Sequence, residues 1–223
     1  MIDKFVADVP AALAGIADGA VVLLPGFGNG TPETLVEGLI AQGATDLTLV
    51  ANSGGRDTGP TADLLATGRV RKLICSYVRP DSVAGRLFAA GKMELEIVPQ
   101  GTLAERLRAA GAGIQAFYTP TGADTLLAEG RETRIINGRN CLLEYPLAGD
   151  VALIDAWEAD RWGNLTHRES ARNFNPVMAM AAKLTVVQTR HVLPLGGIPP
   201  QNVHTPGVFV HRVVHVPGQE TTP

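Results

Sequence analysis

The stretch AVVLLPGFGNGTPE at residues 20–33 combines a strand, a glycine-rich loop and the start of a helix. Residues 20–24 form a continuous apolar run, which is typical of a strand that is covered on both faces of a sheet. We expect Thr31 to cap the helix that follows, with Pro32 at its first position, because both residue types favour helix starts. Gly43 is expected to end that helix in the left-handed conformation.

The same succession of strand, polar loop and helix recurs along the first half of the chain. Apolar runs predict further strands within residues 47–51, 70–77 and 95–98. Helices are expected within residues 62–67, within residues 82–90 with Ser82 as the cap, and from Thr102 to a stop at Gly111. Strands that alternate with helices predict an α/β fold with a mainly parallel open sheet and flanking helices.

The second half of the chain carries a different pattern. Asn137-Gly138 lies between two short strand-like runs within residues 134–143, which predicts a hairpin with a tight turn. Further strands are expected within residues 151–156, 185–188 and 208–214, and a short helix within 176–183. No linker or repeat interrupts the chain. We therefore expect one domain over residues 1–216, in which an antiparallel hairpin is added to the parallel sheet, and a loose tail at 217–223.

Composition and charge exclude several classes of protein. Hydrophobic residues make up 45% of the 223 residues and charged residues 18%, which is typical of a globular protein with a buried core. The net charge is -3 and no long run of Lys or Arg is present, so nucleic acid is not an expected partner. The sequence contains no candidate membrane span, and its first residues lack the apolar core of a signal peptide. We expect a cytoplasmic protein.

The sequence gives little support for a bound cofactor or metal. Gly26, Gly28 and Gly30 form G-x-G-x-G, but Thr31 stands where a dinucleotide-binding fingerprint has its third glycine. Asn52 follows the second strand, where such a site would need an acidic residue. Of the five histidines, His211 and His215 would share one face of a strand, but no Asp, Glu or Cys stands at ligand spacing beside them, so no metal site is predicted. The histidines are expected at the surface near a subunit contact. The two cysteines are too few for a disulfide framework.

A ligand site is nevertheless expected at one edge of the sheet. In open parallel sheets, ligands bind outside the carboxyl ends of the strands. The loops expected there span residues 25–31, 52–59, 79–81 and 99–101, and they are rich in Gly, Asn, Ser and Gln. Glycines let a ligand approach the backbone and amide groups donate hydrogen bonds, so the loops suit an anionic or carbonyl-bearing ligand.

Several longer motifs occur in the order that one known family shows. They are Gly-Phe-Gly at 26–28 with Pro32-Glu33, ELEIVPQGTLAER at 94–106, GIQAFYTPTG at 113–122, DRWGNL at 160–165, and ARNFNP at 171–176. On these motifs the sequence resembles the first, or A, subunit of the family I coenzyme A transferases that act on 3-oxoacids. The resemblance runs over nearly the whole chain and implies the fold of those enzymes.

The resemblance also implies a reaction and a partner. In that family, a glutamate attacks the thioester of an acyl-CoA, and CoA then returns to form a glutamyl-CoA thioester, from which the acceptor acid takes it. The predicted strand-end loops hold Asp57 and Asp81 but no Glu, while Glu33 and Glu105 are expected inside helices. The resemblance implies that the nucleophile belongs to a second chain, the B subunit, and that the active site forms where the two chains meet. CoA thioester is then a substrate, with no tightly bound cofactor.

Individual roles can be carried over onto matching positions. Gln100 matches a glutamine whose side chain donates to the oxyanion of the reaction. The loop assigned to CoA binding corresponds to Pro25, Gly26, Phe27, Gly28, Asn29, Gly30 and Thr31, although this chain has Pro25 where the family usually has Gly. Asn52 and Arg79 are the expected substrate-binding residues.

The sequence leaves the acceptor acid and the class of function open. The segments 90–92 and 127–134 look closest to 3-oxoadipate CoA-transferases, with succinyl-CoA as the donor and acetoacetate as the alternative acceptor. The distal carboxylate of 3-oxoadipate calls for an arginine, and of Arg56 and Arg79 we expect Arg79 to supply it. A non-catalytic ligand-binding regulator and a sugar-phosphate isomerase are the alternatives from other classes.

Overall fold

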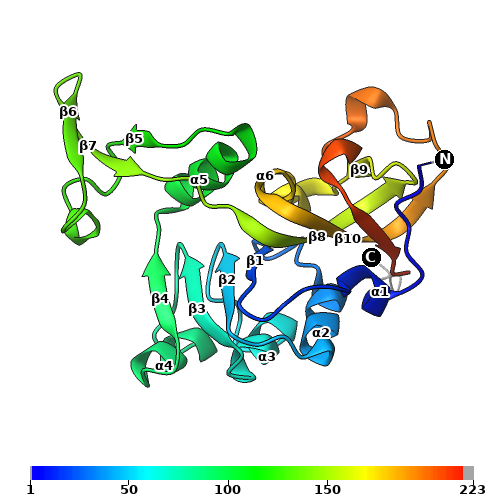
Figure 1. Ribbon diagram of the computed structural model, residues 1–223, viewed down its shortest axis with the longest axis horizontal. Helices are drawn as coiled ribbons and strands as arrows, with labels where there is room; N and C mark the ends of the chain where they lie inside the picture. Colours follow the sequence, from blue (N-terminus) through cyan, green and yellow to red (C-terminus); the bar gives the residue numbers. More distant parts are fainter. Residues whose placement is uncertain (1, 218–223) are drawn as a thin grey trace.

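A computed structural model describes residues 2–217 of the chain, and its centre is an eight-stranded sheet (Figure 1). Seven strands form a parallel array in the order β11-β10-β8-β1-β2-β3-β4, and the short β9 pairs antiparallel with β8. The strands are β1 (Val21–Leu24), β2 (Leu47–Ala51), β3 (Val70–Cys75), β4 (Glu94–Ile97), β8 (Gly149–Asp160), β9 (Leu165–Thr166), β10 (Ala182–Leu193) and β11 (Arg212–His215). The predicted α/β fold with a mainly parallel open sheet is confirmed.

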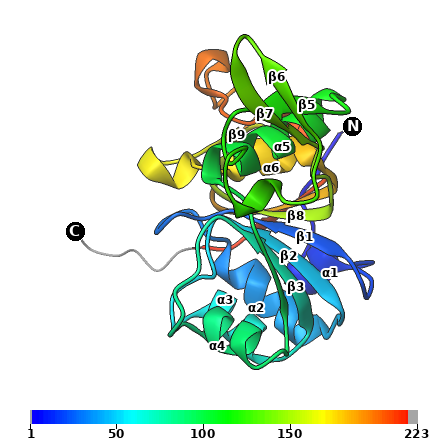
Figure 2. The ribbon, with the colours of Figure 1, turned by 90° about the vertical axis from the view of Figure 1, so that its left-hand side faces the viewer.

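Helices cover both faces of this sheet and bury a separate apolar core on each. The helices are α1 (Val9–Leu13), α2 (Glu33–Gln42), α3 (Pro60–Ala66), α4 (Val83–Ala89), α5 (Gln100–Ala112) and α6 (Asn175–Ala181). Figures 1 and 2 show α2, α3 and α4 on one side of the sheet and α5 and α6 on the other. Because side chains alternate along a strand, Leu49 of β2 packs into the first core and its neighbour Val50 into the second.

Two strands of the second half are longer than the sequence predicted. Residues 151–156 and 185–188 indicated short strands, whereas β8 and β10 each run for 12 residues. Both lie inside the parallel array, with β8 between β1 and β10. Apolar runs mark only the most buried part of each strand, since the last four residues of β10 are not buried. The strand predicted within 208–214 begins only at Arg212.

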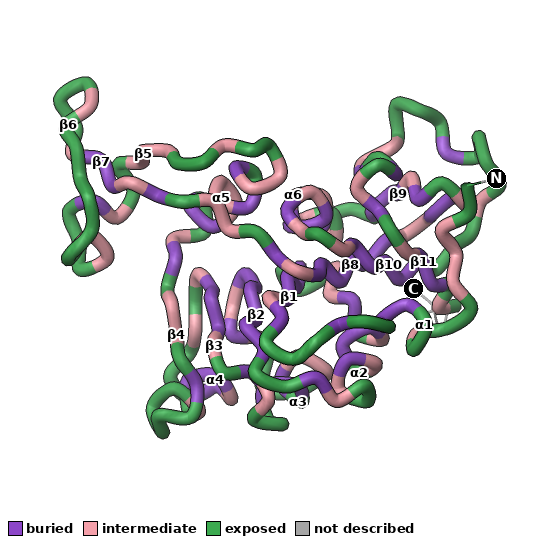
Figure 3. The backbone as a smooth tube through the Cα atoms, viewed as in Figure 1, coloured by how far each residue is buried: buried purple, intermediate pink, exposed green. Residues whose placement is uncertain are grey.

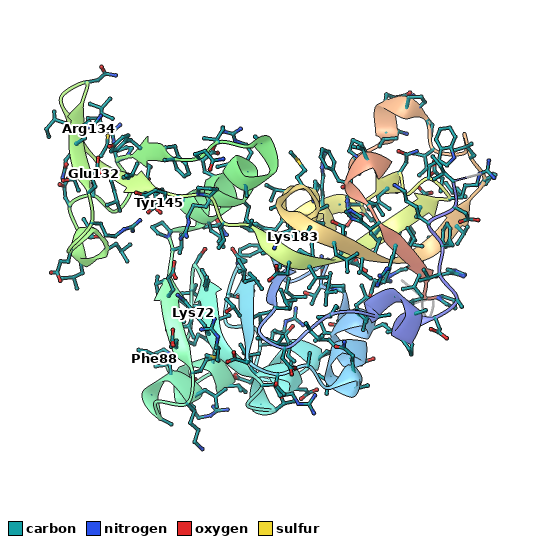
Figure 4. All side chains as sticks on the ribbon, in the orientation of Figure 1. Lys72, Phe88, Glu132, Arg134, Tyr145 and Lys183 are labelled. Carbon is teal, nitrogen blue, oxygen red and sulfur yellow. The ribbon has the colours of Figure 1, made fainter. Side chains whose placement is uncertain are left out.

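The predicted hairpin is confirmed and belongs to a small antiparallel sheet. This sheet consists of β5 (Phe117–Thr119), β7 (Arg139–Glu144) and β6 (Thr133–Ile136) in that order. Asn137 and Gly138 both have positive φ, as a tight hairpin turn requires. The sheet projects from the body as an arm, on which Arg134 lies over the ring of Tyr118 and beside Glu132 (Figure 4). Arg106 of α5 fixes the base of the arm by donating to the Tyr145 carbonyl.

Several helix boundaries differ from the predictions; the helix expected at 176–183, for example, is α6, and residues 182 and 183 already belong to β10. Pro32, not Thr31, is the N-cap of α2, and no side chain caps that end. Helix α5 begins at Gln100 rather than Thr102 and passes through Gly111 before it ends at Gly113. A Cβ at position 111 would lie only 2.7 Å from the Cβ of Met180. Glycine at this position therefore allows α5 to pack closely on α6, although glycine is unfavourable inside a helix. The Ser82 cap of α4 and the left-handed Gly43 are confirmed.

Burial follows the layers of the fold (Figure 3). The central strands β1, β2 and β8 are almost entirely buried, whereas the edge strand β4 and the arm are largely accessible. No helix within residues 2–217 has the length and apolar character that crossing a membrane requires. The tail expected at 217–223 lies, apart from Pro217, outside the described residues.

Candidate active site

The expected ligand site lies at the carboxyl ends of β1, β2 and β3. Strands β1 and β2 pair in register up to Leu24 and Ala51, so the loops that follow them start side by side. These two loops line a cavity of about 270 Å³. A second cavity of about 410 Å³ lies between the loop after β2 and the turn after β3, which contributes Tyr77 and Arg79. Three of the four sequence-predicted loops therefore line cavities at one edge of the sheet.

Asn52 and Gln100, predicted separately from two different loops, form a hydrogen-bonded pair. Asn52 follows β2 and is buried, with 4% of its surface exposed, while Gln100 is the exposed first residue of α5. Nε2 of Gln100 donates to Oδ1 of Asn52 over 2.6 Å. A glutamine amide carries two N–H donors, so the second remains for a ligand. We call Asn52 and Gln100 the amide pair.

The start of α5 adds backbone donors next to the amide pair. The first backbone bond of the helix runs from the Leu103 N–H to the Pro99 carbonyl. The N–H groups of the preceding first turn therefore have no partner within the helix. They lie at the positive end of the helix dipole, which favours a negative charge. The side-chain donor of Gln100 therefore lies beside the free backbone N–H groups of the first turn of α5.

The glycine-rich loop, residues 25–31, needs its glycines for conformation and for close packing. Gly26, Gly28 and Gly30 all have positive φ, between 73° and 128°. A Cβ on Gly30 would lie 2.3 Å from the carbonyl oxygen of Ala171, so only glycine fits against that segment. Phe27 projects from the loop and is 62% exposed. The loop therefore has a fixed shape and presents an aromatic side chain outward.

Two asparagines of the segment 171–176 hold the glycine-rich loop from behind. Oδ1 of Asn173 accepts from the Gly26 N–H over 3.2 Å, and its Nδ2 donates to the Asn29 carbonyl over 3.0 Å. Nδ2 of Asn175 donates to the Gly30 carbonyl over 3.0 Å. These asparagines had no predicted role, although they lie inside one of the motifs on which the family resemblance rests. Their contacts join segments more than 140 residues apart along the chain, which local patterns do not reveal.

The two arginines predicted near the site have different partners. Arg79 forms ion pairs with Asp57 and, over 3.8 Å, with Asp81. Nη2 of Arg56 donates to the carbonyl of Gly28 over 3.2 Å, and Arg56 lines both cavities. Arg79 lines the second cavity but not the first. Arg56 therefore bridges the glycine-rich loop and the loop after β2.

Glu33 lies closer to the site than the sequence predicted. It is the first residue of α2, as expected, but it also lines the cavity between the loops after β1 and β2. Gln100 and Asn52 do not belong to the lining of either cavity found among residues 2–217. The sequence could have indicated this position of Glu33, because Glu33 stands only two residues after Thr31 and the helix therefore begins next to the loop. The cavity thus contains a carboxylate, separate from the amide pair.

A buried polar network joins the middle of β8 and β10 to the start of α2. Asp155 accepts from Nε2 of Gln188 over 2.9 Å, and Oε1 of Gln188 accepts from the Leu35 N–H at the start of α2. Burial raises the pKa of Asp155 to about 6. His167, expected at the surface, is only 5% exposed; it contacts the Asp155 carbonyl and the Thr205 hydroxyl, both over 2.9 Å. Burial lowers the pKa of His167 to about 4, so the ring is neutral near pH 7.

The sheet, the glycine-rich loop and the amide pair define an α/β protein whose strand-end loops present donors that suit an anionic or carbonyl-bearing ligand. Residues 6–216 match the coenzyme A transferase family, and the chain belongs to that family. It is therefore an enzyme chain of the CoA-transferase type, and the resemblance stated from its motifs is confirmed.

Two relatives match along almost the whole chain. The A subunit of 3-oxoadipate CoA-transferase from Pseudomonas putida is 52% identical over 221 residues, which cover 98% of this chain and 96% of that protein. The A subunit of succinyl-CoA:3-ketoacid coenzyme A transferase from Xanthomonas campestris pv. campestris strain B100 is 49% identical over 213 residues, which cover 95% and 88%.

Solved structures share the fold. A variant of the decarboxylase AibA/AibB is 28% identical with a TM-score of 0.82, and the match covers 97% of this chain and 85% of that one. Glutaconate coenzyme A-transferase from Acidaminococcus fermentans is 22% identical with a TM-score of 0.83, covering 96% and 76%. The second likeness shows the fold alone.

Proposed function

We propose that this chain is the A subunit of a two-chain transferase that moves CoA from succinyl-CoA to 3-oxoadipate. The observation that carries the proposal is full-length similarity to two A subunits of 3-oxoadipate CoA-transferases, each 52% identical. The A subunits of enzymes named for 3-ketoacid transfer follow at 45% to 49% identity. Their similarity makes acetoacetate the second candidate acceptor.

In the proposed reaction, this chain stabilises charge and a partner B subunit supplies the nucleophile. A glutamate carboxylate of the partner attacks the thioester carbonyl of succinyl-CoA, and the C–S bond breaks to release CoA thiolate. The thiolate attacks the glutamyl carbonyl of the resulting anhydride, so succinate leaves and a glutamyl-CoA thioester remains. The acceptor carboxylate then attacks that thioester, and the same two steps in reverse produce the new acyl-CoA and the free glutamate.

We assign the amide pair to the negative charge that develops in each of these steps. The free N–H of Gln100 donates to the oxyanion, while Asn52 holds the Gln100 side chain through the other N–H. The unpaired backbone donors at the start of α5 add to the same positive potential. The glycine-rich loop, from Pro25 to Thr31, is assigned to the CoA moiety, because it lines the first cavity and no atom lies within 4 Å of a Cβ placed on Gly28.

The test is the activity of the complex that this chain forms with its B-type partner. The two chains are produced together, and kcat/KM is measured for 3-oxoadipate and for acetoacetate with succinyl-CoA as donor. The proposal requires CoA transfer with a preference for 3-oxoadipate. A preference for acetoacetate replaces the acceptor assignment, and binding of acyl-CoA without turnover identifies a regulator instead of an enzyme.

A further inference from the structure

The two acceptors in question differ in a distal carboxylate, so a cation in the site is the feature that can separate them. 3-Oxoadipate carries a second carboxylate at the far end of its chain, and acetoacetate ends in a methyl group. A buried or half-buried carboxylate needs a matching charge, because an unpaired one is costly. The residues that line the two strand-end cavities include two cations, Arg56 and Arg79.

Arg79 is already neutralised by this chain. Its guanidinium group pairs with Asp57 and also lies within 3.8 Å of Asp81. A ligand carboxylate would have to compete with two protein carboxylates for the same guanidinium. The net attraction of this cluster for a further anion is therefore small.

Arg56 has a charge that the chain leaves unmatched. Within residues 2–217 it forms no ion pair, and its one hydrogen bond, to the Gly28 carbonyl, leaves four of its five N–H donors available. That bond holds the guanidinium against the glycine-rich loop. Arg56 lines both cavities, and it stands four residues after Asn52 of the amide pair. The cation thus lines the strand-end cavities from the loop that begins at Asn52.

We propose that Arg56 is the specificity-determining residue that binds the distal carboxylate of dicarboxylic acyl groups, both the succinyl group of the donor and 3-oxoadipate. The inference rests on the proposed function of the chain. A guanidinium group binds a carboxylate through two parallel hydrogen bonds, which a monocarboxylic 3-oxoacid cannot use. The phosphates of CoA are the other anions in the reaction, but the long pantetheine arm separates them from the thioester. Arg56 lies on the loop that begins at Asn52, the residue that holds Gln100, and we therefore assign it to the acyl end.

The covalent mechanism lets the acceptor be tested by itself. The acceptor reacts with the glutamyl-CoA thioester after the donor acid has left, so its kcat/KM does not depend on how the donor was bound. Arg56→Gln in the two-chain complex is expected to lower kcat/KM for 3-oxoadipate roughly 10- to 100-fold, the range of one charge-assisted interaction. The value for acetoacetate should stay within about threefold. Arg56→Lys, which keeps the charge but loses the paired geometry, should fall between native and Gln.

Three comparisons decide the matter. Arg71→Gln removes an arginine paired with Asp46 at the opposite end of β3, and it should leave the acceptor ratio unchanged. Equal losses on both acceptors in Arg56→Gln, or an acceptor ratio that changes in Arg79→Gln instead, overturn the proposal. A loss that appears with succinyl-CoA but not with succinyl-pantetheine, while both acceptors are unaffected, assigns Arg56 to a CoA phosphate and also overturns it.

The failure of the proposed acceptor can be told apart from the failure of this inference. If the native complex prefers acetoacetate, the donors still provide the test, since succinyl-CoA has a distal carboxylate and acetoacetyl-CoA has none. Arg56→Gln should then lower kcat/KM for succinyl-CoA roughly 10- to 100-fold and leave acetoacetyl-CoA within threefold. Equal losses on the two donors would reject the role of Arg56 regardless of the acceptor.

Discussion

Gln100 owes its position to Asn52 and to the helix that it begins. The hydrogen bond to Asn52 fixes the direction of the side-chain amide, and a buried asparagine is a rigid anchor for it. Motif similarity predicted both residues but could not place them in contact, since 48 residues separate them. For Arg56 and Arg79, the sequence could not show which arginine has an unmatched charge. The sequence favoured Arg79 because it stands where the wider family has a small residue. Its partner Asp57 is 22 residues away and becomes its neighbour only when the loops fold.

Gln100→Ala in the two-chain complex is expected to lower kcat about 10²- to 10³-fold, because one donor to the oxyanion is lost. Assembly should be unaffected, which size-exclusion chromatography checks, since the Gln100 side chain is exposed. Gln115→Ala is a matched control; Gln115 lies beyond the other end of α5 and donates to the Gly113 carbonyl. It should keep native kcat. A loss of less than threefold in Gln100→Ala would leave Gln100 as a turn residue.

A double-mutant cycle extends the same prediction to Asn52. If Asn52 acts by holding Gln100, Asn52→Ala should lower kcat, and the double variant should be little worse than Gln100→Ala. Strictly additive losses would show that the two residues act independently.

At the scale of elements, apolar runs and glycines predicted which segments form strands and helices, but not which elements become neighbours. The strands β1, β2 and β3 and the hairpin turn carry local signals, and they lie where those signals put them. The central positions of β8 and β10 have no local signal, because strand order depends on pairing between distant segments. The same holds for Asn173, which is part of a short motif but acts on a loop at the other end of the chain.

Asn173→Ala tests whether the segment 171–176 sets the shape of the glycine-rich loop. The change removes the bonds to the Gly26 N–H and the Asn29 carbonyl. Each is worth about 1 kcal/mol, so KM for succinyl-CoA should rise roughly tenfold or more, with a smaller change in kcat. Asn140→Ala, which removes a comparable pair of contacts on the arm, is the control and should leave KM unchanged. An unchanged KM in Asn173→Ala would argue against a positioning role.

Two buried groups in contact at the middle of β8, Asp155 and His167, predict an unusual pH dependence of stability. His167 binds a proton less readily when folded, so its contribution to stability is lost as pH falls from 6.5 towards 4. Asp155 binds a proton more readily when folded, so it adds stability as pH falls from about 6 towards 3.8. The two effects oppose each other in the same pH window. Acidification to pH 5 should therefore lower the free energy of unfolding of the native protein by less than the contribution of His167 alone.

The Asp155→Asn variant lacks the stability that Asp155 adds as pH falls. Its free energy of unfolding should fall more steeply than the native value between pH 6 and 4.5, by at most about 1.4 kcal/mol per pH unit. Urea unfolding at pH 7.5, 6 and 5 measures the difference. In Asp150→Asn the removed group has a lowered pKa, held by the Val21 N–H and Lys183, so its profile should depart from the native one only below about pH 4. Parallel native and Asp155→Asn profiles would contradict the assignment.

At the scale of the whole molecule, the amide pair and Glu33 do not line the same cavity. A nucleophile and its oxyanion donors must all lie about 3 Å from the reacting carbonyl group. Glu33 lines the cavity between the loops after β1 and β2, whereas neither member of the amide pair lines that cavity. The sequence had suggested the same division by the lack of a glutamate in its strand-end loops. Under the proposed function, a second chain brings its glutamate to Gln100 and completes the arrangement.

The location of the covalent thioester tests that division directly. When the two-chain complex is incubated with succinyl-CoA and no acceptor, mass spectrometry of the separated chains should find CoA attached to the partner and none on this chain. This chain alone should release no CoA and gain no mass. Glu33→Gln in the complex should still form the thioester on the partner, because Glu33 serves the first turn of α2 and is not the attacking group. CoA bound to Glu33, or turnover by the isolated chain, would move the nucleophile into this chain and remove the need for a catalytic partner.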